Sequence, residues 1–281
     1  KGQTILGRKH IIGPGGKGSN QAIASARLGG NVNFITKVGK DENANMALSL
    51  YREVGINTNS IIQDDSNLTG VAGILIDEKT GDNAINIIPG AAGTITNKDI
   101  ENNLKFIEDS EIFLTQLETP YEATSYALKK AKETGSTIIF NPAPASEILE
   151  QDFELIDYFT PNETEASYYL KKKVETDKEI KEAGEAFLKK GIKNIIITLG
   201  SRGVYFANSN ENYFVEALKL KDKVIDTTGA GDAFNGAFAF ALSKNHTNKE
   251  AIVFANKVAG ISTTKSGAAK SMPTIEEVDK Y

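Results

Sequence analysis

A glycine-rich turn that leads into a long apolar segment is the part of the sequence best suited to chemistry. It lies in the stretch Asp226-Thr-Thr-Gly-Ala-Gly-Asp-Ala-Phe-Asn-Gly, where Gly229, Ala230 and Gly231 are expected to expose backbone amides at a helix start. Such amides favour phosphate or developing negative charge. Asp232 follows directly, where its carboxylate can accept the proton of an attacking hydroxyl. Because a first-turn aspartate also simply stabilises a helix, catalysis is indicated by the combination with the amides and with Asp226.

A second glycine cluster, Gly13-Pro-Gly-Gly-Lys-Gly-Ser-Asn-Gln-Ala, also opens a predicted helix. Its spacing matches neither a Walker A loop nor the dinucleotide-binding fingerprint, so those two modes of nucleotide binding lose support. Three side chains remain that can act on a ligand: Lys17 is a mobile cation, and Asn20 and Gln21 can hydrogen-bond hydroxyl groups. Taken alone, the cluster is also consistent with a glycine-rich turn that carries a solvated lysine.

Polar side chains also follow several predicted strands. Glu118, Asn141 and the pair Asn162 and Glu165 each come after an apolar run. Ligand sites of open α/β sheets lie beyond the carboxyl ends of strands, so these residues are expected to meet Asp232 in one crevice. The oxygens of Asn162 and Glu165 suit Mg²⁺ held partly through water. The same pair is also consistent with a helix cap alone, with Asn162 at the N-cap and Glu165 three residues later.

The elements that position these residues alternate along the chain. Short β-branched runs alternate with amphipathic stretches of helix length, the pattern of a parallel sheet covered by helices on both faces. The predicted strands are 32–38, 60–63, 111–117, 136–140, 158–160, 194–199 and 203–207, and the predicted helices are 19–28, 43–54, 121–133, 163–172, 177–190, 231–243 and 249–264. The expected fold class is α/β, a three-layer sandwich with a mostly parallel central sheet.

One segment breaks this alternation. Gly70-Val-Ala-Gly-Ile-Leu-Ile, a polar turn and Ala84-Ile-Asn-Ile-Ile-Pro are typical of a β-hairpin, and Thr4 to Ile12 also has a strand-like pattern. We expect 1–12 and 70–90 to form a small β-sheet beside one α/β domain that comprises 13–69 and 91–281. The hairpin is also consistent with an edge structure that has no function.

Composition narrows the classes of function. The 281 residues include 32 Lys+Arg and 37 Asp+Glu, which gives a net charge of −5. The absence of cysteine excludes disulfides, thiolate nucleophiles and cysteine-bound metals, and His10 and His246 are too few for a multi-histidine metal site. The excess of acidic residues disfavours binding to nucleic acid or to an anionic membrane. Because the sequence contains no long apolar run and no signal-peptide pattern, the expected location is the cytoplasm. The chain begins at Lys1 and stops within a helical pattern, so both ends are expected to be clipped.

With these motifs combined, the sequence resembles the ribokinase-like carbohydrate kinases of the phosphofructokinase-B type over essentially its whole length. Gly15-Gly-Lys-Gly-Ser-Asn-Gln-Ala is similar to the first signature of that family, and Asp226-Thr-Thr-Gly-Ala-Gly-Asp is similar to the second. Ile87-Ile-Pro-Gly-Ala, Asn141-Pro-Ala-Pro-Ala and Thr160-Pro-Asn-Glu-Thr-Glu-Ala resemble the branch that acts on ribose. The resemblance implies ATP-dependent phosphorylation of the 5-hydroxyl of D-ribose, with ATP, Mg²⁺ and K⁺ as cofactors.

The resemblance also implies roles for individual residues. Asp232 matches the catalytic base, and Gly229, Ala230 and Gly231 match the anion hole. The sugar-binding positions are matched by Gly16, Lys17, Asn20 and Glu118, and the nucleotide-binding positions by Asn162, Thr198, Gly200, Gly229, Gly231 and Asn256. Asn162 and Glu165 match a motif linked to magnesium. A loop site for a monovalent cation, usually potassium, is matched by Asp226, Thr228, Ser262, Thr264, Gly267 and Ser271.

The same resemblance makes the small β-sheet a lid over the sugar, which pairs with the lid of a second subunit. We then expect a homodimer in which the hydrophobic face of the lid, with candidates Val71, Ile74, Ile76, Ile85 and Ile87, is buried between subunits. The first strand of the family, which carries an Asn and an Asp that hold the sugar, has no counterpart here. A longer natural protein is therefore expected.

Other functions stay open. A kinase for deoxyribose, fructose or a nucleoside uses the same chemistry, and Lys17 and Glu118 favour a small polyol without fixing its stereochemistry. A non-catalytic sugar- or nucleotide-binding protein would retain the fold, although the presence of Asp232 argues against it. A dehydrogenase is disfavoured because the dinucleotide fingerprint is absent.

Overall fold

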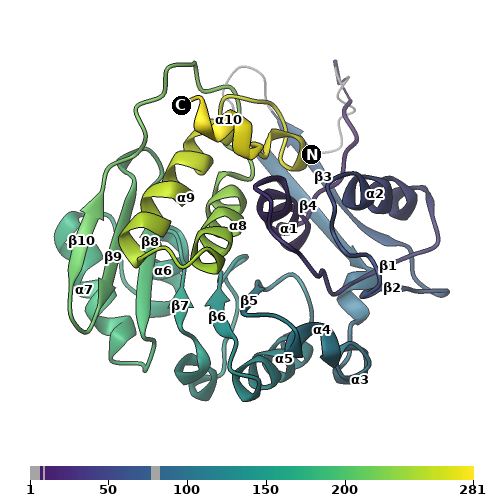
Figure 1. Ribbon diagram of the computed structural model, residues 1–281, viewed down its shortest axis with the longest axis horizontal. Helices are drawn as coiled ribbons and strands as arrows, with labels where there is room; N and C mark the ends of the chain where they lie inside the picture. The colour runs from purple at the N-terminus through teal and green to yellow at the C-terminus, as the bar shows by residue number, and fades with distance from the viewer. Residues whose placement is uncertain (1–6, 9, 77–82) are drawn as a thin grey trace, which may run out of the picture.

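The computed structural model describes residues 7, 8, 10–76 and 83–281, except for the side chains of Ile76, Asn83 and Ile85. Its largest sheet has six strands in the order β10-β9-β8-β7-β6-β5 (Figure 1). The predicted mostly parallel sheet is confirmed. The parallel strands are β5 (Ile112–Thr115), β6 (Thr137–Phe140), β7 (Tyr158–Phe159) and β8 (Asn194–Thr198), and the antiparallel ones are β9 (Val204–Asn208) and β10 (Asn212–Val215).

Two details of the predicted strands differ from the structure. The segments 32–38 and 60–63 contribute a separate parallel pair, β1 (Thr36–Val38) with β2 (Ile61–Gln63), and do not extend the large sheet. Strand β10 is missing from the prediction. A short apolar run indicates that a segment is extended, but it does not specify the strand with which that segment pairs.

Helices cover both faces of the large sheet, so the three layers are also confirmed (Figure 1). Successive strand side chains point to opposite faces. Ile139 and Ile196 pack in a core with α1, α8 and α9, whereas Ile138 and Ile197 pack in a second core with α5 and α7. The helices are α1 (Lys17–Arg27), α2 (Glu42–Glu53), α3 (Asn97–Glu101), α4 (Leu104–Glu108), α5 (Tyr121–Glu133), α6 (Glu163–Leu170), α7 (Asp177–Leu188), α8 (Ala230–Ser243), α9 (Asn248–Ser262) and α10 (Ile275–Asp279), with 3-10 turns η1 (Ala91–Thr94), η2 (Glu150–Leu155), η3 (Gly200–Arg202) and η4 (Ala269–Ser271). Within the described ranges, no helix has the length and apolar character needed to span a bilayer.

The predicted hairpin is present as β3 (Thr69–Ile76), paired antiparallel with β4 (Asn83–Gly90). Val71 lies opposite Ile88 on one face of the hairpin, and the register places Ile74 and Ile87 on the other. All four are exposed, by 43 to 56%. The expectation of one shared face is therefore wrong for Val71, since strand residues an odd number of positions apart point in opposite directions. The side chains of Ile76 and Ile85 lie outside the described part.

The expected strand at 4–12 is not observed where it can be assessed. Residues 4–6 and 9 lie outside the described residues, and residues 7, 8 and 10–12 form no strand.

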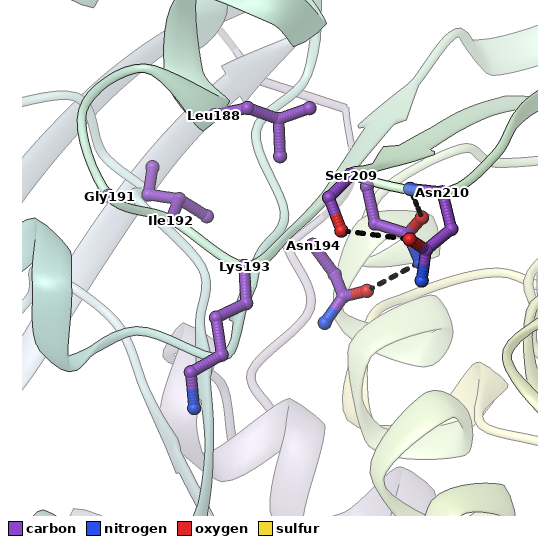
Figure 2. Close-up of a pocket in the computed structure, with 8 residues that line it drawn as sticks. Leu188, Gly191, Ile192, Lys193, Asn194, Ser209 and Asn210 are labelled. Carbon is purple, nitrogen blue, oxygen red and sulfur yellow. Dashed lines mark hydrogen bonds between the residues drawn. The ribbon is translucent and has the colours of Figure 1, made fainter.

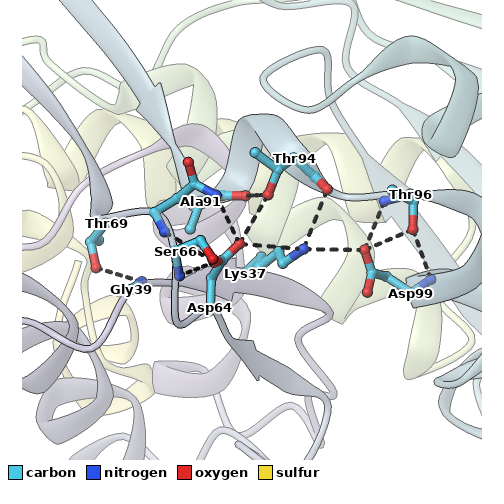
Figure 3. A network of polar contacts seen from close by, with 10 residues as sticks. Lys37, Gly39, Asp64, Ser66, Thr69, Ala91, Thr94, Thr96 and Asp99 are labelled. Carbon is cyan, nitrogen blue, oxygen red and sulfur yellow. Dashed lines mark hydrogen bonds and ion pairs between the residues drawn. The ribbon is translucent and has the colours of Figure 1, made fainter.

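A polar network fixes the base of the hairpin to the rest of the molecule (Figure 3). The Lys37 ammonium on β1 lies 3.5 Å from carboxylate oxygens of both Asp64 and Asp99. Asp64 also accepts hydrogen bonds from the amides of Ser66 and Asn67, just before β3, at 2.7 and 3.0 Å. These bonds, that of the Ser66 amide above all, hold the pKa of Asp64 well below its ordinary value. The base of the hairpin is thus built around an ionised carboxylate.

Candidate active site

The carboxylate of Asp232, in the first turn of α8, is the centre of a buried polar cluster. Only 6% of the residue is exposed. Its Oδ2 accepts a hydrogen bond from Asn20 Nδ2 at 2.8 Å, and its Oδ1 accepts one from Gln21 Nε2 at 3.0 Å. Because both donors belong to α1, the two glycine-rich motifs of the sequence meet at this carboxylate.

Helices α1 and α8 approach closely enough for these contacts because Gly236 lies between them. A Cβ at this position would come within 2.4 Å of the Gln21 carbonyl oxygen and 2.7 Å of the Ala24 Cβ. Any larger residue would push the helices apart and lengthen the hydrogen bonds to Asp232.

Charges of both signs surround Asp232. Burial raises the pKa of Asp232 above its ordinary value, Lys17 and the two amide donors oppose this rise, and Glu118 adds to it. Burial also raises the pKa of Glu165, which interacts electrostatically with Lys17 and Asp232. The structure therefore places the charged groups of Asp232, Lys17, Glu118 and Glu165 close enough to interact electrostatically. A carboxylate with a raised pKa is a stronger base than an ordinary aspartate, as proton acceptance requires.

The start of α1 presents polar groups that are not fully satisfied. Glu118 Oε2 accepts a hydrogen bond from the Lys17 amide at 2.6 Å, next to Gly16, whose φ of 88° favours glycine. Among the residues that the structure describes, the Lys17 ammonium has no hydrogen-bond or ion-pair partner. Asn20 Oδ1 is buried without a partner. An unpaired buried acceptor beside a free cation indicates that a polar ligand completes this site.

The turn before α8 keeps two of its three amides free. Gly229 adopts a left-handed φ of 79°, and the amide of Ala230 donates to the Thr227 carbonyl at 3.2 Å. Across the described ranges, the amides of Gly229 and Gly231 have no acceptor. A Cβ on Gly231 would meet nothing within 4 Å, so this side of the turn is open. We expected all three amides to be free. This is wrong for Ala230, because the tight turn directs its amide to the Thr227 carbonyl.

Asn162 and Glu165 form the helix cap that the sequence allowed as an alternative. Each side chain accepts a hydrogen bond from the other residue's amide at 2.8 Å. Asn162 also bridges to Thr198 at the carboxyl end of β8, and Gly200 begins η3 just beyond. The cap uses Asn162 Oδ1 and Glu165 Oε2, so Glu165 Oε1 stays available to a ligand. Capping and ligand binding are thus compatible.

Asp226 joins the segment before α8 to the loop after α9. Its two oxygens accept hydrogen bonds from the amides of Thr228 and Gly267, each at 2.9 Å. Burial raises the pKa of Asp226, but these hydrogen bonds outweigh burial and hold the pKa below its ordinary value. The hydroxyls of Ser262, Thr264 and Ser271 instead donate to the nearby backbone carbonyls of Ala259, Ile261 and Ala268. Among the residues that the structure describes, hydrogen bonds thus connect Asp226 with Thr228 and Gly267, but not with Ser262, Thr264 or Ser271.

Asn256, on α9, is not joined to the other predicted site residues by any hydrogen bond. Its Nδ2 donates to the Glu216 carbonyl at 2.6 Å, which leaves its amide oxygen for a ligand.

Two further side chains belong to the Asp232 cluster. Asn141, which was expected in the crevice, accepts a hydrogen bond from Gln21 Nε2 at 3.0 Å. Gln116, which was not singled out, donates to Gln21 Oε1 at 2.5 Å. It directly follows β5, so the rule that identified Glu118, a polar residue just beyond a strand, could also have found it.

A surface hollow of about 410 Å³, shown in Figure 2, is lined by residues other than those of the Asp232 cluster. Its lining includes Lys193 and Asn194 at the amino end of β8, together with Ser209 and Asn210 between β9 and β10. The Lys193 ammonium is paired with Asp157 at 2.6 Å. The Asp232 cluster belongs to the carboxyl edge of the sheet, where ligand sites of open α/β sheets lie, whereas this hollow lies at the amino edge.

Comparisons with known proteins agree with this geometry. Residues 1–275 match the model of the pfkB family carbohydrate kinases. The chain is 40% identical to the ribokinase of Staphylococcus aureus, over 95% of this chain and 87% of the relative. It is 33% identical to a deoxyribokinase of Salmonella typhi, over 100% of this chain and 91% of the relative.

A solved structure is similar over the whole chain. It is that of Arabidopsis thaliana ribokinase complexed with ribose and ATP, with a TM-score of 0.91 at 28% identity, over 100% of this chain and 91% of that chain. The family resemblance seen in the motifs is therefore confirmed, and the chain belongs to the pfkB family of carbohydrate kinases.

Proposed function

We propose that this protein is a ribokinase, which transfers the γ-phosphoryl group of ATP to the 5-hydroxyl of D-ribose. The observation that carries the proposal is the buried Asp232 carboxylate, each oxygen of which accepts a hydrogen bond. Asp232 is the acidic residue of α8. It stands directly after the free amides of Gly229 and Gly231. The names of the Staphylococcus and Arabidopsis proteins support ribose as the acceptor.

The proposed reaction is a direct transfer. The 5-oxygen of ribose forms a bond to the γ-phosphorus, and the bond from that phosphorus to the bridging oxygen breaks, with its electron pair left on ADP. Asp232 accepts the hydroxyl proton and later releases it to solvent. The amides of Gly229 and Gly231, with the positive end of the α8 dipole, stabilise negative charge on the migrating group.

The sugar is assigned to the start of α1. Asn20 Oδ1, buried and unpaired, is positioned to accept a hydrogen bond from a sugar hydroxyl. Glu118 can accept a second such bond, the Lys17 ammonium can donate one, and Gly16 lets the backbone approach the sugar without a side chain. These groups suit a polyol better than a flat apolar base.

The nucleotide is assigned to the region around Asn162, Thr198 and Gly200, with Asn256 as a further contact. Mg²⁺ fits here, because oxygen donors are what it prefers and Glu165 keeps one carboxylate oxygen outside the helix cap. Asn162 and Glu165 would hold it, partly through water. When bound, Mg²⁺ neutralises charge on the β- and γ-phosphates.

A monovalent cation, K⁺ by preference, is assigned to the loop around Asp226. The depressed pKa of Asp226 keeps this carboxylate ionised at neutral pH, and hydroxyl and carbonyl oxygens of the same loop supply neutral donors. Thr228, Ser262, Thr264, Gly267 and Ser271 complete the assigned set. Gly267 donates to Asp226, and a Cβ built on Gly229 would come within 3.1 Å of the Ala268 Cβ, so the cation loop and the turn before α8 lie close together. An ordered cation loop would therefore also order the anion hole.

The hairpin is assigned as a lid over the sugar and as a homodimer contact. Apolar side chains are exposed on both of its faces, Leu75 by 76% and Ile87 by 53%. Such a hairpin is expected to be covered by a second copy. A concentration-independent monomer mass in light scattering would contradict this assignment, whereas a dimer that Leu75→Lys dissociates would support it.

An enzyme that consumes ATP and pentose is assigned to the cytoplasm.

The experiment that tests the function is ADP release from ATP and Mg²⁺ with D-ribose, 2-deoxy-D-ribose, D-fructose and adenosine. Each acceptor is measured with K⁺ and with a large organic cation in its place. We expect the highest kcat/KM for ribose and stimulation by K⁺. Deoxyribose is the favoured rival because of the Salmonella relative. A higher kcat/KM for deoxyribose would reassign the substrate, and binding of ribose without ADP release would reassign the protein as a binding protein.

A further inference from the structure

Gln21 contacts Asp232 but offers no free group to a ligand. We propose that Gln21 is a positioning residue, which fixes the orientation of the Asp232 carboxylate and is itself fixed by Gln116 and Asn141. The inference rests on the proposed phosphoryl transfer, in which Asp232 accepts the proton.

The direction of the Gln21 amide group follows from its neighbours. Asn141 Nδ2 donates to the Thr160 carbonyl at 3.0 Å, and since a carbonyl can only accept, Asn141 must turn its Oδ1 toward Gln21. Gln21 Nε2 then donates to Asn141 Oδ1 and to Asp232 Oδ1, each at 3.0 Å. A reversed amide would place the Gln21 oxygen against two acceptors.

The amide oxygen of Gln21 is also engaged. Gln21 Oε1 accepts a hydrogen bond from Gln116 Nε2 at 2.5 Å, on the side away from Asp232. Gln21 is 1% exposed. Rotation of its amide group would break buried hydrogen bonds that water cannot replace, so the donor to Asp232 has one direction.

Asn20 and Gln21 therefore differ in role although both donate to Asp232. Asn20 Oδ1 is buried and unpaired, which leaves Asn20 shared between the base and the sugar. Gln21 has its amide oxygen and both amide hydrogens engaged within the protein. Gln21 thus holds the base before any sugar is bound.

The same buried network continues to the anion hole. Thr160 Oγ1 donates to Asn235 Oδ1 at 2.6 Å, and Asn235 Nδ2 donates to the Gly231 carbonyl at 2.8 Å. From Gln116 through Gln21 and Asn141, one frame of neutral side chains connects the base with the turn that carries the free amides. This frame sets the two catalytic features relative to each other.

The hydrogen bond from Gln21 also favours the ionised form of Asp232, because a donor stabilises a carboxylate. The charged groups that face Asp232 are Lys17 from α1, Glu118 from the loop after β5 and Glu165 from α6. Two of these three are acidic. Without Gln21, burial and these acids would make proton uptake by Asp232 occur at a higher pH.

The test is Gln21→Met, which keeps the length of the side chain and removes its polar atoms. Tyr51→Phe is the matched control, because it removes a buried hydrogen bond of 2.9 Å to Ser19 on the same helix without reaching Asp232. We expect Gln21→Met to lower kcat roughly 10- to 100-fold, the effect of a misplaced catalytic group. KM for ribose and for ATP should stay within about threefold, and the acid limb of the kcat/KM profile should move to higher pH by roughly one unit. Tyr51→Phe should alter thermal stability alone.

The outcomes separate the two levels of the argument. If the wild-type protein does not phosphorylate ribose, the proposed function fails. If it does, and Gln21→Met retains the kcat and pH profile of Tyr51→Phe, the positioning role fails. Should Gln21→Met not fold, Gln116→Met decides, since it removes only the anchor of Gln21. A lower kcat with unchanged KM then supports the role, and a wild-type kcat overturns it.

Discussion

Asp64 and Asp232 show how differently one residue type behaves in two regions of this molecule. At the base of the hairpin, Asp64 receives hydrogen bonds from backbone amides two and three residues away, and Lys37 lies beside it. In the candidate active site, Asp232 receives hydrogen bonds from two neutral side chains more than 200 residues away in the chain. The pKa of Asp64 is lowered, chiefly by the Ser66 amide, whereas burial raises the pKa of Asp232.

The difference teaches that the source of the donors separates a structural carboxylate from a reactive one. A local turn supplies Asp64 with oriented amides, so its ionised form is stable and unreactive. Burial disfavours the ionised form of Asp232, so the acceptance of a proton relieves the cost of a buried charge. The stable aspartate supports the base of the hairpin, and the destabilised one is suited to be a base.

The largest effect is expected at the reactive aspartate. Asp232→Ala should lower kcat for ribose phosphorylation by roughly 10²–10⁴, the range for loss of a general base, because no other carboxylate contacts Asn20 and Gln21. ATP affinity should change little, as measured by calorimetry. The matched variant Asp64→Asn should keep kcat within about threefold, since Asp64 lies outside the cluster. Equal losses in both variants would erase the distinction between the two carboxylates.

The next largest effect is expected at the turn before α8. Gly229→Ala forces an L-residue into a φ of 79° and places a Cβ 3.1 Å from that of Ala268. The free amides should then shift, and kcat should fall roughly 10- to 100-fold, somewhat less than the loss of a whole oxyanion donor. Gly135→Ala is the control, because Gly135 has a similar φ of 83° and open space around it. Both variants should lose stability in thermal unfolding, and only Gly229→Ala should lose turnover.

The sequence predicts the fold well because its signals are local. Alternating apolar runs and helix-length stretches anticipated the mostly parallel sheet, and the turn between two β-branched runs anticipated β3 with β4. Pairing partners were not encoded locally, and for that reason β1 and β2 were expected in the large sheet. The face of Val71 was missed for a similar reason, since composition alone does not fix strand register.

The site was predictable residue by residue but not contact by contact. The glycine motifs predicted roles for Asp232, Asn20 and Lys17, and the structure brings these three residues together. No sequence pattern near Gln21 indicated that its amide donates to Asp232 and not to a sugar. The hydrogen bond to Asp232 depends on Gly236, which allows α8 to pack against α1, and on Gln116, which follows β5. The amide of Ala230 was predicted to be free, but it donates to the Thr227 carbonyl. That hydrogen bond depends on the geometry of the turn, which the sequence does not specify.

The pH dependence of activity should differ from that of stability. As pH falls through the raised pKa of Asp232, the base becomes protonated, and kcat/KM should drop about tenfold per pH unit in a limb above the ordinary aspartate value of about 3.9. Glu165, also raised by burial, titrates in the same direction. Asp64 and Asp226 have lowered values, so the stability they contribute is present above the ordinary value and is lost only below it.

A pH series should therefore show loss of activity before loss of structure. Ribose-dependent ADP release and far-ultraviolet circular dichroism, recorded on the same samples, check this order. Asp64→Asn should leave the acid limb of activity in place and change only the acid unfolding. Coincidence of the two transitions in the wild-type protein would contradict the assignment of the limb to Asp232.

The smallest effect is expected at the base of the hairpin. Lys37→Met removes the ammonium 3.5 Å from both Asp64 and Asp99 and leaves two carboxylates without their shared cation. The Lys37 side chain is only 14% exposed, so solvent screens the loss weakly. We expect Tm to fall by about 2–4 °C, a modest loss for a domain of this size, with kcat unchanged. Lys40→Met is the control, because the ion pair of Lys40 with Asp65 is exposed and should shift Tm by less than about 1 °C. Equal shifts in the two variants would show that burial of the Lys37 network does not stabilise the base of the hairpin, whereas a fall in kcat for Lys37→Met alone would mean that the stable aspartate and the reactive one are coupled through the hairpin.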